Sequence, residues 1–235
     1  MLDKESGVFI TGTDTNIGKT LVSASLAWKL SKHKDKVCIM KPFATSNKKY
    51  SNRYNSRDLY LLLKSLKIKE EQFYLNPYFY MIAASPFMAS EILNKEPSSI
   101  KIAFERFRYL RKKYNFVVVE GIGGIMVPLN DKHFLIDFIK LIKLPIIIVA
   151  TPKVGTLNHI LLTVKMCRNY RIPIRGIIFN KMPQKATIVE QKTPAFINKL
   201  TKIPILGIIP SFKNIKYNDN MFERISNLID YPLIK

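Results

Sequence analysis

Apolar residues in this chain gather in short, mostly apolar runs, and these alternate with stretches where apolar residues recur at helical spacing. A short apolar run is typical of a strand buried on both faces of a parallel sheet, and recurrence every three or four residues is typical of a helix. Strands are predicted at 8–10, 37–40, 116–119, 146–150, 174–180 and 203–209, and helices at about 18–31, 58–66, 85–93, 98–113, 134–142 and 155–170. Strands alternating with helices pair in parallel through right-handed crossovers.

Two segments follow neither pattern. Residues 46–54 are polar and basic with few apolar anchors, which predicts a flexible loop. Residues 73–80 are aromatic but contain Asn76-Pro77, and a proline removes a ladder hydrogen bond. We therefore expect 73–80 to be a packed irregular segment rather than a strand.

The first predicted strand runs into a glycine-containing turn that ends in Gly18-Lys19-Thr20 at the start of a helix. This is the layout of a phosphate-binding loop, in which backbone N–H groups and a helix N-terminus surround a polyphosphate. Lys19 would reach the β and γ phosphates, and the Thr20 hydroxyl would bind magnesium. The alternative is a glycine turn without a ligand. The spacing departs from the standard motif, since Thr13 occupies the position of the first glycine and Gly12 lies one residue earlier.

Three charged residues are candidates for the site, and two of them lie at the carboxyl ends of strands, where open α/β sheets place their chemistry. Lys41 follows the second strand, and is either a solvated charge or a second cation directed at the phosphates. Asp58 begins a helix, where it either complements the helix dipole or binds magnesium. Glu120 ends a strand and precedes a glycine turn, an arrangement that favours a magnesium-shell carboxylate.

Composition is that of a globular protein with an unusual charge. The 235 residues are 47% hydrophobic, which suffices for a full core, and we expect one domain over 1–235. The formal net charge is +21. Because lysines are spread along the whole length, the charge indicates compositional drift rather than a nucleic-acid site, and we expect no nucleic-acid partner. Part of the field would attract anionic substrates.

Cysteine content and the chain start bear on the compartment. Cys38 and Cys167 have neither disulfide nor metal-ligand spacing, which favours reduced, buried thiols. The start lacks the apolar segment of a signal peptide, and no apolar run approaches the roughly 20 residues of a membrane span. We expect a cytoplasmic protein without a membrane partner.

Taken together, the motifs resemble those of the dethiobiotin synthetase family, in family order over nearly the whole chain. A threonine at the position of the first glycine, here Thr13, is itself characteristic of that family. The matching segments are Thr11 to Thr20, Lys41-Pro42, Asn55-Ser56 with Asp58, Leu75 to Tyr78, Ser85-Pro86, Val118 to Gly121 with Gly123-Gly124 and Pro128, Gly155 to His159, Asn180, and Gly207 with Pro210.

The resemblance implies a P-loop NTPase-like three-layer fold, with a mainly parallel central sheet flanked by helices, and a specific reaction. Family members convert ATP, carbon dioxide (or bicarbonate) and 7,8-diaminononanoate to dethiobiotin, ADP and phosphate in biotin biosynthesis. The reaction proceeds through a carbamate and a carbamic-phosphoric anhydride, with Mg²⁺ as cofactor. Members are homodimers with sites at the subunit interface.

The resemblance also implies site residues. Lys19 and Lys41 would be catalytic, and Thr20, Asp58 and Glu120 would hold magnesium. Thr15, Lys41 and Thr45 would contact the carbamate or diamine, and the partner subunit's helix start, equivalent to Gly155-Thr156-Leu157-Asn158, would hold the substrate carboxylate. The residues implied at ATP are Thr13, Asn16, Ile17, Gly18, Lys19, Thr20, Leu21, Asp58, Glu120, Gly121, Ile122, Gly123, Asn180, Lys181, Pro210, Ser211 and Phe212.

Three departures affect the details of the site. Arg57 separates Ser56 from Asp58, where relatives usually have Ser-Asp directly, so Asp58 could be displaced from the metal. Ser46 replaces a glycine, and Phe87 replaces a histidine that is common in the family.

Two alternatives use the same loop. A partitioning-type P-loop ATPase that binds DNA would account for the charge, but such proteins carry a signature lysine where this chain has Asp14. A non-catalytic nucleotide-binding scaffold would not need Lys41 and Glu120 at two separate strand ends.

Overall fold

The centre of the molecule is a six-stranded sheet in the order β2-β5-β1-β6-β7-β8, with every neighbouring pair parallel. The computed structural model describes residues 7–33 and 36–230. The strands are β1 (Gly7–Gly12), β2 (Val37–Met40), β5 (Phe116–Glu120), β6 (Ile146–Ala150), β7 (Ile174–Met182) and β8 (Ile205–Pro210). All six predicted strands are present within a few residues of their expected bounds, and the predicted fold class is confirmed.

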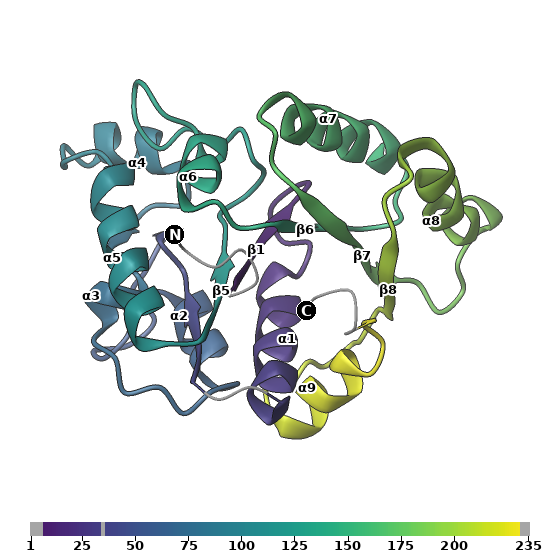
Figure 1. Cartoon of the computed structure of the whole chain (residues 1–235), viewed down its shortest axis with the longest axis horizontal. Coiled ribbons are helices and arrows are strands. Elements are labelled where there is room, and N and C mark those ends of the chain that lie inside the picture. Colours follow the sequence, from purple (N-terminus) through teal and green to yellow (C-terminus); the bar gives the residue numbers. More distant parts are fainter. Residues whose placement is uncertain (1–6, 34–35, 231–235) are drawn as a thin grey trace.

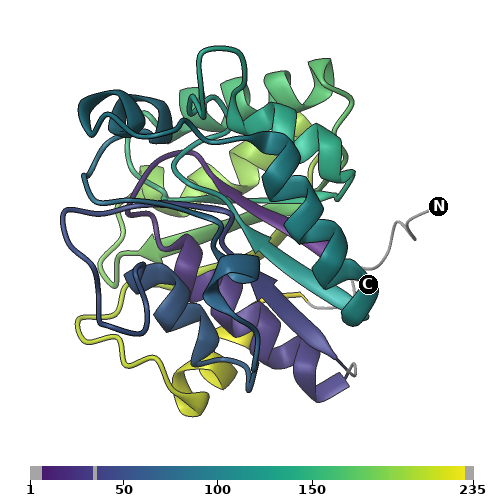
Figure 2. The same cartoon turned by 90° about the vertical axis from the view of Figure 1, so that its left-hand side faces the viewer.

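Helices cover the sheet on both faces (Figure 1). One face packs against α1 (Lys19–His33) and α9 (Asp219–Ser226), and the other against α5 (Ile100–Lys113), α6 (Leu135–Ile142), α7 (Thr156–Asn169) and α8 (Ile188–Thr201). Figure 2 shows the sheet between these two layers, with the purple α1 and yellow α9 below it. The short helix α2 (Arg57–Leu63) packs beside α1 and β2, and α4 (Pro86–Ile92) lies near the second sheet described below.

Two apolar cores explain the unbroken apolar runs. In β1, Phe9 faces the core shared with α5 and α6, whereas Val8 and Ile10 face the core shared with α1. Successive side chains of a strand point to opposite faces, so a strand covered on both faces must be apolar at every position. All six residues of β1 are buried.

The prediction for residues 73–80 was wrong in part. The segment forms a short helix, α3 (Gln72–Leu75), and then β4 (Tyr78–Tyr80), which pairs in parallel with β3 (Phe43–Thr45). The irregular backbone is confined to Asn76-Pro77, where the Asn76 amide donates to the Lys41 carbonyl at 2.7 Å and the Tyr78 carbonyl at 3.0 Å. The proline lies outside the ladder, so it does not prevent pairing.

The structure also contains α8 and α9, which the apolar pattern did not predict. The 46–54 segment has neither helix nor strand, as predicted, and the Ser46 and Ala83 N–H groups tie it to β4 and the chain that follows. Cys38 and Cys167 are both free and buried, as expected. None of the helices in the described part of the chain combines the length and apolar character needed to cross a bilayer.

Candidate functional site

The phosphate-binding loop lies between β1 and α1, and its backbone shape depends on a contact with β7. Asn16 and Gly18 have positive φ angles of 54° and 91°. The Asn180 amide donates to the Ile17 carbonyl at 2.7 Å, and a Cβ on residue 18 would lie 2.0 Å from the same amide nitrogen. Glycine is therefore required at position 18 for both its φ angle and the close approach of Asn180.

Lys19 turns back toward the loop. Its ammonium donates to the Asp14 carbonyl at 2.7 Å, and the residue is only 7% exposed. Burial, together with the nearby charge of Lys41, lowers the pKa of Lys19 to about 8. Because no described carboxylate forms an ion pair with Lys19, its charge is available to an anion.

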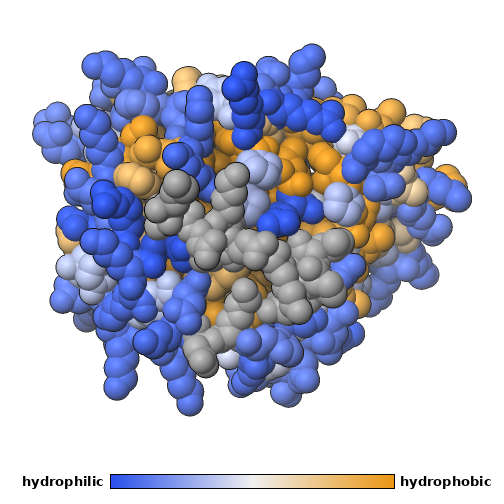
Figure 3. Space-filling view, viewed as in Figure 1, coloured by the Kyte–Doolittle hydropathy of each residue, from blue (hydrophilic) through white to orange (hydrophobic). Residues whose placement is uncertain are grey.

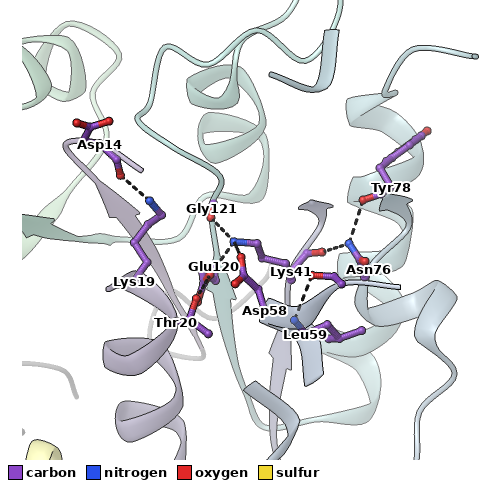
Figure 4. Close-up of polar contacts among 11 residues, drawn as sticks. Asp14, Lys19, Thr20, Lys41, Asp58, Leu59, Asn76, Tyr78, Glu120 and Gly121 are labelled. Carbon is purple, nitrogen blue, oxygen red and sulfur yellow. Dashed lines mark hydrogen bonds and ion pairs between the residues drawn. The ribbon is translucent and has the colours of Figure 1, made fainter. Parts of the chain in front are cut away.

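Lys41 lies at the centre of the polar cluster drawn in Figure 4. The parallel register pairs Met40 with Val119, so the next residues, Lys41 and Glu120, emerge side by side from β2 and β5. The Lys41 ammonium donates to Glu120 Oε1 at 2.6 Å and to the Gly121 carbonyl at 2.9 Å. The Lys41 and Glu120 side chains are 3% and 0% exposed, so this ion pair is shielded from water.

Asp58 joins this cluster from the first turn of α2. Ser56 caps that helix by accepting from the Leu59 N–H at 3.3 Å, which leaves the Asp58 carboxylate free to reach Lys41, 3.2 Å away. The charge of Lys41 lowers the pKa of Asp58. Burial alone would lower the pKa of Lys41, but the charges of Glu120 and Asp58 outweigh it and raise that pKa. Asp58 therefore contacts Lys41 even though Arg57 separates it from Ser56.

The donor set around Glu120 fits a magnesium ion. The Thr20 hydroxyl donates to Glu120 Oε1 at 3.1 Å, and Glu120 Oε2 is buried without a hydrogen-bond partner. A buried carboxylate oxygen without a partner indicates a missing donor or cation. No group of three or more His, Cys, Asp or Glu side chains forms a metal cage within residues 7–33 and 36–230. Magnesium at nucleotide sites needs only one or two carboxylates beside the phosphates, so the residues present suffice.

The predicted residues converge on a cavity of about 560 Å³. Those that line it are Thr15, Asn16, Gly18, Lys19, Thr20, Leu21, Lys41, Thr45, Asp58, Glu120, Ile122, Gly123, Asn180, Lys181, Pro210, Ser211 and Phe212. Three predicted residues do not line the cavity: Thr13, Ile17 and Gly121. The Ile17 carbonyl accepts from the Asn180 amide and the Gly121 carbonyl from the Lys41 ammonium, so these two residues help to hold lining side chains in place. The 155–158 segment lies outside the lining, at the start of α7.

Several lining residues were not predicted: Ala44, Arg57, Leu61, Lys213, Ile215 and Tyr217. Tyr217 lies just before α9, and burial together with the charges of Glu120 and Asp58 raises the pKa of its hydroxyl. The hydroxyl thus stays protonated. Residues 213–217 follow no apolar period and match no motif, so the sequence gives no signal that Tyr217 lines the cavity. Tyr217 reaches the cavity because the chain returns toward α1 at this point.

The pKa of Lys19 predicts a pH dependence of triphosphate binding. A bound triphosphate favours the charged ammonium and raises this pKa, so binding above about pH 8 must take up a proton. Affinity should fall by up to about tenfold per pH unit above that value. Calorimetry with ATP at about pH 8.5 in two buffers of different ionisation enthalpy should show uptake approaching one proton. Lys213→Ala, which removes another cation of the cavity, should leave the uptake unchanged, and an uptake of zero in the wild type would disprove this role of Lys19.

Two solved structures have a similar fold. A ParA family ATPase from Chlorobium tepidum TLS has a TM-score of 0.53 at 17% identity, covering 96% of this chain and 91% of that chain. The MinD cell division protein of Aquifex aeolicus has a TM-score of 0.55 at 17% identity, covering 93% and 86%. At these identities the likeness shows the fold alone, so it does not favour the partitioning alternative.

Sequence relatives are much more similar and agree on one family. Residues 6–218 match the AAA domain family. The ATP-dependent dethiobiotin synthetase BioD of Nitrosopumilus maritimus is 37% identical, over 88% of this chain and 90% of the relative. The proteins of the same name from Bacillus subtilis (strain 168) and Thermodesulfovibrio yellowstonii are 34% and 36% identical, each over 89% of the relative and 89% and 88% of this chain. The chain therefore belongs to the ATP-dependent dethiobiotin synthetase family.

Proposed function

We propose that this protein closes 7,8-diaminononanoate and carbon dioxide into dethiobiotin at the expense of ATP. The observation that carries the proposal is the buried Lys41 ammonium, held between Glu120 and Asp58 beside the phosphate-binding loop. Lys19 begins α1, and Lys41 is a second buried cation that follows β2, so it suits a second anion next to the nucleotide. A carbamate is such an anion.

The proposed reaction consists of three steps. One amine of the substrate adds to carbon dioxide and loses a proton, which gives a carbamate. A carbamate oxygen attacks the γ-phosphorus, and the bond from this phosphorus to ADP breaks. The second amine then attacks the carbonyl carbon of the anhydride, loses a proton and expels phosphate. Negative charge collects on oxygen atoms in every step, so fixed cations and positioning supply most of the catalysis. No Ser-His-Asp set is required.

Lys19 and Lys41 have different tasks in this scheme. Lys19 forms no ion pair with a carboxylate in the described part of the chain, and it neutralises the β and γ phosphates. Lys41 already pairs with two carboxylates, and it orients the carbamate oxygen while those carboxylates keep it charged. The hydroxyls of Thr15 and Thr45, both in the cavity lining, hold the carbamate or the diamine.

Magnesium and the adenine pocket complete the nucleotide site. Thr20, Asp58 and Glu120 would hold Mg²⁺, which screens the charge of the phosphates when bound. Glu120 Oε2 is the ligand atom that lacks any other partner. Asn180 and the 210–212 turn, which also line the cavity, border the adenine.

A homodimer accounts for the position of the α7 start. Gly155, Leu157 and Asn158 are exposed and do not line their own cavity, so they are free to hold the substrate carboxylate in a partner's site. Apolar side chains surround them: Val154 is 92% exposed, Leu161 38% and Leu162 57%. Clustered exposed apolar residues mark interaction surfaces.

The reaction itself gives the first test. Purified protein with ATP, magnesium, bicarbonate and 7,8-diaminononanoate should form dethiobiotin and release one phosphate per product. Mass spectrometry of the product and a phosphate assay measure both. Omission of the diamine is the control, and folded protein that binds ATP but forms no dethiobiotin would overturn the proposal.

Lys41→Ala tests the second cation. Loss of one charge that stabilises the transition state should lower kcat by at least about a hundredfold. Calorimetry should still detect ATP binding, because Lys19 and the loop are intact. Lys213→Ala is the matched control, since it removes another cation of the cavity lining. Normal turnover of Lys41→Ala would remove Lys41 from the mechanism.

Leu161→Glu tests the dimer. A carboxylate on the exposed face of α7 should convert the dimer to a monomer and lower activity, because the partner's 155–158 segment no longer reaches the site. Light scattering after gel filtration measures the mass. Ile102→Glu on α5 introduces the same charge at a residue that is 41% exposed, and it should leave the mass unchanged. A wild-type protein that is monomeric and fully active would contradict the shared site.

A further inference from the structure

A second cavity, of about 710 Å³, adjoins the nucleotide cavity. The two cavities share four lining residues, Arg57, Leu61, Ile215 and Tyr217. The remaining lining of this side cavity comes from the 48–50 segment, from α2 and the residue after it, and from residues 216–218. Its volume is that of a typical small-molecule site, and nothing in the proposed reaction uses it.

The lining of the side cavity is strongly basic. Four basic residues contribute to it, and none of the described residues that line it is acidic. The basic residues are Lys48, Arg57, Lys64 and Lys216. In the part of the chain that the structure describes, none of these four forms an ion pair. Four cations in one concave surface repel each other, and a bound anion relieves that repulsion. The cavity is therefore complementary to a multiply charged anion.

Tyrosine side chains form the other part of the lining. The rings of Tyr50 and Tyr60 stack with their centroids 4.4 Å apart, and the Lys64 ammonium lies 5.1 Å from the Tyr60 centroid. The loop that carries Tyr50 closes on itself, since the Tyr50 N–H donates to the Asn55 carbonyl at 2.9 Å. Flat aromatic faces beside cations are what proteins use to hold a heteroaromatic ring that bears a phosphate.

We propose that the side cavity binds a second, non-reacting nucleotide, of the class of nucleoside monophosphates, while ATP occupies the reaction site. The phosphate contacts the lysines and the base lies against the tyrosines. The two sites are coupled through Arg57, which lines both cavities and precedes Asp58, the carboxylate that pairs with Lys41. This inference does not depend on the identity of the amine substrate.

The probe for this site is AMP, titrated into protein already saturated with magnesium and a non-hydrolysable ATP analogue. Calorimetry should show one further binding event per chain that weakens with added salt. Lys64→Ala and Lys216→Ala line only the side cavity, and each should weaken AMP by roughly tenfold or more, since a charged hydrogen bond is lost. Affinity for the analogue should not change. Lys67→Ala, an exposed lysine of the same region outside both cavities, should behave as wild type.

Ribose 5-phosphate distinguishes a nucleotide site from a plain phosphate site. It should bind more weakly than AMP, and Tyr60→Leu should reduce that difference, because the ring contact is lost. The proposal would be overturned if no second binding event is detected. It would also be overturned if Lys64→Ala and Lys216→Ala leave AMP binding unchanged, or if Lys67→Ala weakens it equally. A further contradicting result is a loss of analogue affinity in Lys64→Ala. The last would mean that ATP itself fills the side cavity.

Discussion

The ion pair between Lys41 and Glu120 is the constraint on which the site depends. Removal of two charges from water costs several kcal/mol per ion, and only close geometry with additional hydrogen bonds offsets that cost. Here the offset comes from Asp58, Thr20 and the Gly121 carbonyl. The two charges meet because β2 and β5 are neighbours in parallel register, Met40 beside Val119. A one-residue slip would turn Lys41 to the other face of the sheet and leave Glu120 buried and unpaired.

The pKa values of the two lysines of the site shift in opposite directions. Lys41 has two carboxylate partners that hold its proton and raise its pKa, whereas Lys19 has a lowered pKa and, among the described residues, donates to a backbone carbonyl and forms no ion pair. Lys19 is therefore the cation whose charge is less well stabilised, and an anion that enters the cavity would gain more from contact with it. The charge of Lys41 is already held by Glu120 and Asp58.

The sequence was most informative where one local rule determines the outcome. Apolar runs such as 146–150 predicted buried strands, and parallel strands bring their carboxyl ends to one edge of a sheet, where Lys41 and Glu120 indeed meet.

The sequence was least informative where long-range contacts determine the structure. Three-residue strands such as Tyr78–Tyr80 are too short to show a period, and α8 contains Pro194, a residue type that disfavours a helix interior. Tyr217 joins the cavity only through the return of the chain, and Asp58 reaches Lys41 only because Ser56 caps α2.

Arg57 and Asp58 are neighbours in the chain that contribute to different parts of the site. Because Ser56 caps the helix, the first two residues of α2 are Arg57 and Asp58, and consecutive helical side chains diverge by about 100°. Asp58 points to Lys41, and Arg57 lies in the wall between the two cavities. Arg57 thus adds a cation to this wall, and none of the described residues that line the side cavity is acidic. The net charge of +21 does not reveal this placement. Figure 3 shows hydrophilic side chains along most of the edge of one face of the molecule. The placement of a few cations in a concave site, rather than their total number, determines what the charge can bind.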